Sequence, residues 1–571
     1  MENTQVANIL DEIADLLELR EADEFRVRAY RNASRTIRGL SQRLEDLLDE
    51  DKDLTKLSNV GQSTADKIRE ILETGTCQRL EELKKKVPEQ LTELMKVPQL
   101  GPRKVMQLHD ELGVDNLDDL EKACEEHSVR ELPGMGKKTE ENILKGIKTF
   151  AATSGRHSIK AASEHVDTLG RQLDRVSSIN QWVVAGSFRR CKETIGDLDV
   201  LMQAKKRSRA TKEILDLELV DEVVSKGEER ITVRLKGGLQ VDFRFFEQKA
   251  FGSAMIYFTG SKAHNIALRK RAQQNDWKLN EYGLNKGKRS LAGKTEESVY
   301  HRLSLSWIPP ELRENRGELE AAENDELPHL IDIDDILGDL HVHTKASDGT
   351  NTIEEMVDAA RRRGYSYLAI TDHSKAVTVA NGLDEKRLKK HAERIREVNE
   401  SMKNFRLLAG VEVDILKSGK LDLDEDALAE LDWVCASIHS YFSLDKKKMT
   451  DRLLSAIRSG VVHTLGHPSG RMIGKRDPIA FDVDKVFEAC HDNNVCLEIN
   501  AQPERLDLLD TYCQRGRDAG VDFVIGTDAH KQDDLDFMRF GVGVARRGWL
   551  EKKNVLNTRT TRQLEKHLKR S

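Results

Sequence analysis

The chain has 571 residues, of which 38% are hydrophobic and 33% are charged, and its formal net charge is −7. A single hydrophobic core rarely supports such a length, so we expect three to four compact units. No apolar run reaches the ~20 residues that a membrane span needs, which excludes an integral membrane protein and favours a soluble one.

The cysteines and the first residues indicate where the protein works. Seven cysteines are scattered without a Cys-x-x-Cys pair, which is typical of a reducing compartment and argues against zinc sites built from thiolates. Residues 1–20 are acidic and amphipathic, unlike a secretory signal. We therefore expect a cytoplasmic protein with no membrane association.

One pattern recurs three times in residues 1–150: an apolar residue, a short glycine turn, and a helix that opens with small and basic residues. The turns lie at residues 57–61, 97–101 and 132–136. Glycine lets backbone N–H groups approach an anion closely, and a helix start carries partial positive charge. A packing corner between helices explains one such turn as well as DNA binding does. Three copies favour DNA.

These turns resemble the helix-hairpin-helix motif, which contacts DNA phosphates without reading bases. The resemblance implies an N-terminal helical DNA-binding domain over residues 1–80 and a fingers domain over residues 81–150. The implied DNA-binding residues are Val60, Gly61, Leu100, Gly101, Arg103, Lys104, Gly134, Gly136 and Lys137.

Three aspartates on two predicted strands form the next candidate site. Alternate residues of a strand face the same side, so Asp197 and Asp199 project together, and Asp242 lies on a further strand with the same alternation. Clustered carboxylates repel one another unless divalent cations neutralise them, and two such cations can activate a 3′-hydroxyl and stabilise a leaving pyrophosphate. A solvated strand edge is the alternative, but the Gly186–Ser187 turn upstream favours nucleotidyl transfer.

Gly186–Arg190, the three aspartates, and Tyr257–Ser261 with Asn265 and Arg269 resemble a family X DNA polymerase, the group that includes DNA polymerase beta. The resemblance implies a nucleotidyltransferase palm over residues 151–250 and a thumb over residues 251–315. It also implies Mg²⁺ or Mn²⁺ on the catalytic Asp197, Asp199 and Asp242. The implied contacts with a deoxynucleoside triphosphate are Gly186, Ser187, Arg190, Gly196, Tyr257, Phe258, Gly260, Lys262, Asn265 and Arg269.

Two positions depart from the pattern of that family, and one further lysine matches it. Cys191 stands where many relatives have glycine, and Lys262 replaces an acidic residue, which adds positive charge near the nucleotide or the template. Lys67 matches the lysine that forms a Schiff base with an abasic sugar in the animal enzyme. An ordinary exposed helix lysine explains Lys67 equally well.

The remaining chain alternates apolar runs with helical stretches. Residues 316–336 are acidic and are expected to be a linker that lies against one of its neighbouring domains. Over residues 337–571 the repeating strand-helix unit predicts a parallel sheet closed as a barrel. Nine possible metal ligands follow the apolar runs, at the carboxyl ends where barrel active sites form. They are His341, His343, Asp348, His373, Glu412, His439, His467, Asp528 and His530.

These nine residues resemble the metal ligands of the polymerase and histidinol phosphatase (PHP) domain. The resemblance implies a distorted (β/α)7 barrel that holds up to three ions. Imidazole and carboxylate ligands suit Mn²⁺, Zn²⁺ or Fe²⁺, and clustered cations favour phosphoester hydrolysis. Four other histidines are not predicted to bind metal. His391, His491 and His567 are predicted to lie on the surface, and His463 has no predicted partner. Arg471 and Lys375 either hold a phosphate or are surface charges.

Together these features predict a multidomain α+β and α/β enzyme. The expected function is DNA-directed DNA polymerisation that fills short gaps in DNA repair, with a metal-dependent 3′–5′ exonuclease or related 3′-end processing, including abasic endonuclease or 3′-phosphatase activity. The expected partners are gapped or nicked double-stranded DNA and deoxynucleoside triphosphates, bound by a monomer. The alternative is a small-molecule phosphatase of the histidinol-phosphate type, fused to a DNA-binding scaffold whose polymerase site is vestigial.

Overall fold

The computed structural model describes residues 3–20, 24–38, 40, 44–49, 52–88, 91–95, 97, 100–144 and 156–569. The chain divides into two compact units, each considered by itself below: Met1–His157 with Thr211–Asp242, and Ser158–Ala210 with Phe243–Ser571. The predicted boundary between residues 150 and 151 lies outside the described residues. Among the described helices, none combines the length and the apolar character needed to cross a membrane.

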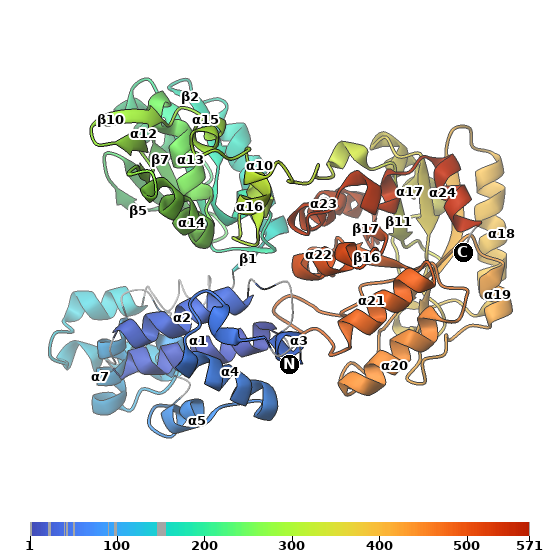
Figure 1. The fold of residues 1–571 in the computed structure, drawn as a ribbon, viewed down its shortest axis with the longest axis horizontal. Coiled ribbons are helices and arrows are strands. Elements are labelled where there is room, and N and C mark those ends of the chain that lie inside the picture. Colours follow the sequence, from blue (N-terminus) through green and yellow to red (C-terminus); the bar gives the residue numbers. More distant parts are fainter. Residues whose placement is uncertain are drawn as a thin grey trace. The chain divides into compact units, whose positions relative to one another are not determined.

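Short helices make up the N-terminal part of the first unit, coloured blue in Figure 1. They are α1 (Asn3–Leu19), α2 (Glu24–Arg38), α3 (Leu44–Asp49), α4 (Gln62–Thr74), α5 (Gln78–Lys84), α6 (Leu91–Leu94), α7 (Pro102–Leu112) and α8 (Leu117–Glu125). Helix α1 buries one stripe, with Val6, Leu10, Ile13 and Leu17 at helical spacing, and it packs on α2, α5 and α7. The apolar stripe, and not helix propensity alone, therefore holds these short helices together.

A five-stranded sheet follows, in the order β2-β4-β7-β6-β5. Its strands are β2 (Ile179–Val184), β4 (Asp197–Ala204), β5 (Val220–Lys226), β6 (Arg230–Leu235) and β7 (Gln240–Phe245). Helices α10 (Ile159–Leu173), α11 (Gly186–Arg189) and α12 (Arg207–Leu215) and the small pair β1 (His157–Ser158) and β3 (Thr194–Ile195) accompany it. Strand β4 pairs with β2 in antiparallel register, Val200 opposite Val184, and buries Leu198 and Val200.

The next elements are helical with one small sheet, in the order β10-β9-β8. They are α13 (Phe251–Thr259), α14 (Lys262–Gln273), β8 (Lys278–Asn280), β9 (Gly283–Lys286), β10 (Arg289–Ala292), α15 (Glu296–Arg302) and α16 (Glu318–Glu323). Their core includes Tyr300, Ile308 and Leu312.

Residues 316–336, which the sequence predicts to be a linker, are partly folded into this core. Helix α16 buries Leu319 and Ala322, and the Glu318 carboxylate is buried 2.7 Å from His264 Nδ1. The backbone N–H groups of Asn315 and Arg316 also donate to Glu318. The segment thus lies against its neighbour, and Glu318 has partners that the acidic composition alone does not reveal.

Seven parallel strands in sequence order form the C-terminal barrel. They are β11 (Gly338–Val342), β12 (Tyr367–Ile370), β13 (Arg406–Asp414), β14 (Trp433–Ser437), β15 (Thr464–Leu465), β16 (Cys496–Asn500) and β17 (Phe523–Gly526). Hydrogen bonds from Asp528 N to His341 O and from His343 N to Ala529 O, both 2.9 Å, join the last strand to the first. The predicted seven-stranded barrel is thus confirmed.

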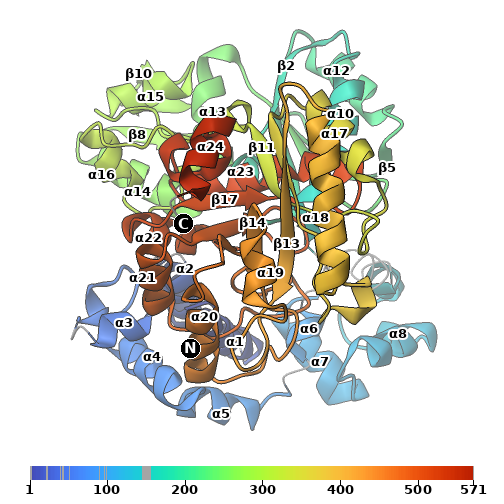
Figure 2. The same cartoon turned by 90° about the vertical axis from the view of Figure 1, so that its right-hand side faces the viewer.

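Helices cover the outside of these strands, as α18 beside β13 illustrates in Figure 2. They are α17 (Ile353–Arg362), α18 (Glu385–Glu400), α19 (Glu425–Ala429), α20 (Lys446–Ile457), α21 (Val483–Asp492), α22 (Asp510–Asp518), α23 (Met538–Arg547) and α24 (Thr561–Leu568). Because helices and the barrel interior bury both faces, β11, β12, β14, β16 and β17 are buried throughout, which explains why they appear as continuous apolar runs.

His463, which had no predicted partner, lies in the barrel wall. Its ring stacks on Trp433 at 5.4 Å, and its Nδ1 accepts a hydrogen bond of 3.0 Å from Val434 N. Burial, with the nearby His567, lowers the pKa of His463 to about 4. The ring is therefore neutral in the folded protein under ordinary conditions.

This neutral histidine predicts a pH-dependent loss of stability. Below the ordinary histidine pKa, His463 is protonated in the unfolded chain but stays neutral in the folded one. The free energy of unfolding should therefore fall as the pH drops from ~6.5 to ~4, by up to about 3 kcal/mol. In His463→Asn, whose amide oxygen replaces Nδ1 as acceptor, the part of this slope due to His463 should vanish. Calorimetric unfolding of both proteins across this range measures the difference, and equal slopes would contradict the assignment.

Candidate metal and nucleotide sites

The nine predicted metal ligands come together at the carboxyl ends of the barrel strands. Glu412 of β13 is central: its Oε2 lies 2.8 Å from His373 Nδ1, and its Oε1 lies 2.8 Å from His467 Nε2 and 3.3 Å from His439 Nε2. His341 Nε2 is 3.6 Å from the same carboxylate. One buried carboxylate thus contacts imidazoles from four different strand ends.

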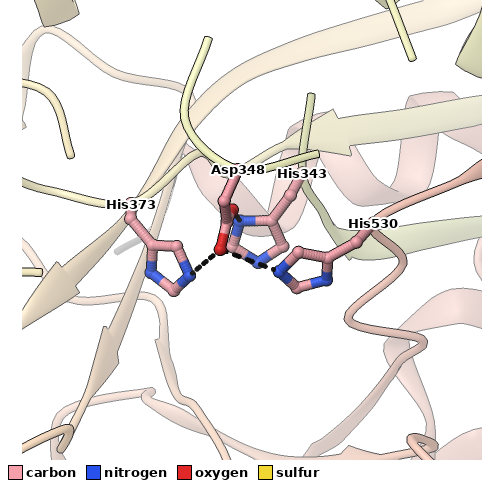
Figure 3. A group of neighbouring side chains, drawn as sticks. All are labelled: His343, Asp348, His373 and His530. Carbon is pink, nitrogen blue, oxygen red and sulfur yellow. Dashed lines mark ion pairs between the residues drawn. The ribbon is translucent and has the colours of Figure 1, made fainter. Parts of the chain in front are cut away.

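Eight of the nine residues form three adjoining groups with metal-site spacing. Figure 3 shows the first, in which Asp348 lies 3.4 Å from His530 Nε2, 3.5 Å from His373 Nε2 and 3.8 Å from His343 Nδ1. The second contains His341, His343 and Asp528, and the third contains His373, Glu412 and His439. In each group the ligand atoms lie within 4.8 Å of one another. His343 and His373 each belong to two groups, so the groups form one continuous cluster.

The donor atoms of this cluster fit metal ions. Buried polar atoms almost always have hydrogen-bond partners, yet His341 Nε2, His343 Nδ1 and His467 Nδ1 are buried and have none among the described residues. A cation would supply the missing contact. Burial raises the pKa of the neighbouring Cys435 to about 12, so its sulfur stays a thiol and the donors are nitrogen and oxygen.

Two residues of the cluster, His343 and Glu412, have the charge states that bind metal at neutral pH. Burial and the positive charges of His530 and His373 lower the pKa of His343 to about 4, so its ring is neutral. The Glu412 carboxylate is buried, but the surrounding imidazoles hold its pKa well below its ordinary value. A neutral imidazole and an ionised carboxylate are the forms that bind metal.

Buried residues that the sequence analysis missed orient the ligands. Glu498 of β16 accepts from His341 Nδ1 at 2.6 Å and from His467 N at 2.6 Å. The Glu498 carboxylate lies between two glycines: a Cβ added at Gly526 would come within 2.2 Å of its Oε1, and one at Gly466 within 3.6 Å of its Oε2. A glutamate in a fully buried strand was the signal in the sequence, since such a charge needs a partner.

Two more carboxylates support the cluster from behind. Asp414 Oδ1 lies 3.1 Å from His439 Nδ1. Asp372 accepts from Ser347 Oγ at 2.6 Å and from His391 Nε2 at 2.8 Å. The prediction that His391 is a surface residue is wrong: its side chain is 10% exposed and faces Asp372.

The two basic residues considered for phosphate binding are both engaged elsewhere. Arg471 is buried, donates to Leu506 O, and forms an ion pair of 2.8 Å with Glu193. Lys375 forms an ion pair of 2.5 Å with Glu385 near the surface. Neither lies free beside the metal ligands.

The glycine-serine turn and Asp199 lie together on the five-stranded sheet. Gly186 has φ +67°, and an added Cβ there would come within 3.3 Å of Asp199 Oδ2, so the close approach requires glycine. Asp199 Oδ1 is 3.5 Å from Arg244 Nε. Asp197 and Gly196 are exposed at the start of β4, and Ser187 is half-buried in α11.

Asp242 is buried on β7, the strand next to β4 in the sheet order. Its carboxylate accepts a hydrogen bond of 2.7 Å from Thr232 Oγ1 and forms an ion pair of 2.8 Å with Arg230.

The expected nucleotide-binding residues after β7 gather at the end of α13 and the start of α14. The rings of Tyr257 and Phe258 are 5.0 Å apart, edge to face, and Asn265 Nδ2 donates to Tyr257 O at 2.7 Å. Arg269 and Lys262 are exposed on α14. A Cβ on Gly260 would come within 3.2 Å of the Arg190 guanidinium, so this segment faces the Gly186–Arg190 turn.

The helical part presents the predicted DNA-binding turns at helix starts. Gly61 and Gly101 are the N-caps of α4 and α7, both are exposed, and an added Cβ would meet nothing within 4 Å. Gly134 has φ +78°, and residues 137–144 after Gly136 are helical. Val60 and Leu100 are buried beneath the turns, whereas Arg103 and Lys137 are exposed and Lys104 is half-buried. Lys67 Nζ donates to Ser63 Oγ at 2.9 Å.

Known protein families match several successive regions of the chain between residues 1 and 502. Residues 1–77 match a helix-hairpin-helix domain, and residues 91–149 match a SAM-like helix-hairpin-helix tandem. The DNA polymerase beta palm matches residues 156–263 and the DNA polymerase beta thumb matches residues 254–314. The PHP domain matches residues 339–502.

Curated relatives match either the whole chain or less than half of it. The chain is 38% identical to the "DNA polymerase/3'-5' exonuclease PolX" of Bacillus subtilis over 575 aligned residues, which cover 100% of both proteins. It is 29% identical to a "Probable phosphatase" of Vibrio parahaemolyticus over 242 residues, 40% of this chain and 93% of the relative. A "Probable phosphatase" of Acetivibrio thermocellus is 29% identical over 201 residues, 34% of this chain and 78% of that protein.

Proposed function

Because the chain belongs to the family X DNA polymerases that carry a C-terminal PHP domain, we propose that it extends and trims DNA 3′ ends at two separate sites. It is a DNA-directed DNA polymerase and a 3′–5′ exonuclease. The observation that carries this conclusion is the whole-length identity of 38%, which covers the palm and the barrel alike. The small-molecule phosphatase alternative is disfavoured, since the phosphatase relatives match only 40% and 34% of this chain.

The proposed polymerase site consists of Asp197, Asp199 and Asp242 with the glycine-serine turn. The contact of Gly186 with Asp199 and the order of β4 and β7 in the sheet support it. The site would hold Mg²⁺ or Mn²⁺. The proposed contacts with the deoxynucleotide are Gly186, Ser187, Arg190, Gly196, Tyr257, Phe258, Gly260, Lys262, Asn265 and Arg269. In this arrangement the Tyr257 and Phe258 rings wall the sugar and the Arg190 guanidinium binds phosphate oxygens.

The proposed exonuclease site is the nine-residue cluster of the barrel. Both enzyme families depend on metals, and we propose Mn²⁺, Zn²⁺ or Fe²⁺ in up to three positions, in keeping with the three adjoining ligand groups. When bound, such ions supply a nucleophilic water and neutralise phosphate charge. The protein's part is to hold the imidazoles and carboxylates in place, through Glu498 behind His341 and Asp414 behind His439.

The helix-hairpin-helix parts bind DNA, and we propose gapped or nicked duplexes as the substrate in base excision or gap-filling repair. The proposed functional domains are residues 1–80, 81–150, 151–250, 251–315 and 337–571. We further propose that the enzyme acts as a monomer in the cytoplasm, where its seven free cysteines would stay reduced. Lys67 remains a candidate for lyase chemistry, because it lies on α4, the helix that begins at the first predicted DNA-binding turn.

Electrostatic contacts at the turns predict a salt-dependent affinity for DNA. Each phosphate contact contributes a slope of about −0.9 to log K against log salt, so Lys137→Ala should weaken binding and reduce the slope by about 1. Lys85→Ala, which removes an exposed lysine at the C-cap of α5, is the matched control. Fluorescence anisotropy on a gapped duplex at several salt concentrations measures both slopes. A slope unchanged by Lys137→Ala would remove this residue from the interface.

One experiment tests the function as a whole. A labelled duplex with a one-nucleotide gap is incubated with the protein and Mn²⁺, with and without deoxynucleoside triphosphates. The expected result is extension by one nucleotide when triphosphates are present and stepwise shortening when they are absent, both stopped by a chelator. Hydrolysis of histidinol phosphate without either DNA product would instead support the small-molecule phosphatase.

A further inference from the structure

The segment that follows the glycine-serine turn is attached to the barrel at three successive points. Arg547 of α23 donates to Arg190 O at 2.8 Å, Arg471 pairs with Glu193 at 2.8 Å, and α23 lies close against Cys191. A Cβ added at Gly543 would lie 3.1 Å from the Cys191 Cβ, so glycine is needed for this approach. The barrel therefore holds the backbone of the segment that begins at Arg190.

Arg547 also reaches the side chain of Arg190 through a shared carboxylate. Glu314 Oε1 accepts from Arg190 Nε at 3.1 Å and from Arg547 at 3.0 Å. The Arg190 guanidinium donates in addition to Thr259 O, at the end of α13. Arg547 thus touches Arg190 at its carbonyl and, through Glu314, at its guanidinium.

The second terminal nitrogen of the Arg547 guanidinium is held by another barrel helix. Its guanidinium donates to Asp510 Oδ2 of α22 at 2.5 Å, and Arg316 donates to the same oxygen at 3.2 Å. Arg547 is 4% exposed, so these bonds are shielded from water and salt. The positive charge of Arg547 also acts on Lys192, which follows the Gly186–Arg190 turn: together with burial, it lowers the pKa of Lys192 to about 8.

We propose that Arg547, a barrel residue, is a positioning residue of the polymerase site: it holds Arg190 in the orientation that binds the nucleoside triphosphate. This inference rests on the proposed role of Arg190. A preorganised guanidinium loses little freedom on binding phosphate, so the benefit should appear in nucleotide affinity. The barrel then contributes to polymerisation through its contacts with the palm, independently of its own metal cluster.

The test compares two neighbouring arginines of α23. Arg547→Lys keeps the buried charge but cannot reach Arg190 O, Glu314 and Asp510 together, and it should raise the KM for deoxynucleotide about tenfold with a much smaller change in kcat. Arg546→Lys is the matched control, since Arg546 joins α23 to Glu311 and Ile331 O without touching Arg190. Exonuclease activity of each full-length variant reports whether the barrel is intact.

A double-mutant cycle separates positioning from general damage. If Arg547 acts through Arg190, then Arg547→Lys should add less than about twofold to the KM of Arg190→Lys, because coupled effects are not additive. Independent, multiplied effects, or an equal rise in KM from Arg546→Lys, would overturn the proposal. Lack of extension by the unaltered protein would refute the polymerase function itself, which is a distinct outcome.

If Arg547→Lys disrupts folding, a substitution at the close contact between α23 and Cys191 tests the same proposal. Gly543→Ala should push the turn through Cys191 and raise the nucleotide KM, and Cys191→Gly should restore it by making room, since Cys191 already has a φ of 53°. A KM unmoved by Gly543→Ala, or a rise that Cys191→Gly does not relieve, would count against the proposal.

Discussion

Asp199→Asn should abolish primer extension while leaving the exonuclease intact. The amide has the shape of the carboxylate and fits beside Gly186 and Arg244, but it lacks the charge needed to hold a divalent cation. Loss of a group that acts on the transition state costs on the order of 10³-fold in rate. Single-nucleotide incorporation on gapped DNA, under single-turnover conditions, measures this loss.

The control for this variant is an aspartate of the same region with a structural contact. Asp174 accepts from Trp182 Nε1 at 2.8 Å, an interaction that an amide oxygen also satisfies. Asp174→Asn should therefore polymerise at the normal rate. Extension by Asp199→Asn within about tenfold of the unaltered protein would exclude Asp199 from the catalytic site, because cation binding there could not depend on it.

Glu412→Gln should have the reverse effect, abolishing the exonuclease and sparing the polymerase. Glu412 contacts His373, His467 and His439, so its amide variant keeps the packing but removes the negative charge at the centre of the cluster. We expect a loss of exonuclease rate on the order of 10³-fold and a lower content of transition metal in the purified protein. Elemental analysis and the shortening assay measure the two effects separately.

Glu551→Gln is the matched control, since Glu551 accepts from His329 N and pairs with Lys553 instead of contacting the cluster. It should keep its metal and its exonuclease activity. If Glu412→Gln also stopped extension, the two activities would share one site, contrary to the separate carboxylate and imidazole clusters.

Local patterns in the sequence were sufficient to predict the strands and the alternation of buried and accessible side chains along them. The alternation that exposes Asp197 and buries Leu198 and Val200 is a property of a few consecutive residues. His341 and Glu412 lie at the same end of the barrel, because all seven barrel strands are parallel and their carboxyl ends meet there. Such features depend on short-range geometry, which the sequence displays directly.

Partners distant along the chain could not be predicted in the same way. His391 appeared to be a surface residue because its neighbours on α18 are charged, whereas its partner Asp372 follows another strand. Arg471 was considered for phosphate binding, but its partner Glu193 lies 278 residues away. The folding of α16 onto the thumb depends likewise on His264, which no local composition reveals.

The glycine beside Glu498 influences where the His341 ring lies. Glu498 receives the Nδ1 proton of His341, so Nε2 is the nitrogen that faces the cluster. A Cβ at Gly526 would come within 2.2 Å of Glu498 Oε1 and 2.6 Å of the His341 Cβ, so a larger residue would displace the carboxylate or the ring. The orientation of this histidine therefore depends on a residue without a side chain, which is not itself one of the predicted ligands.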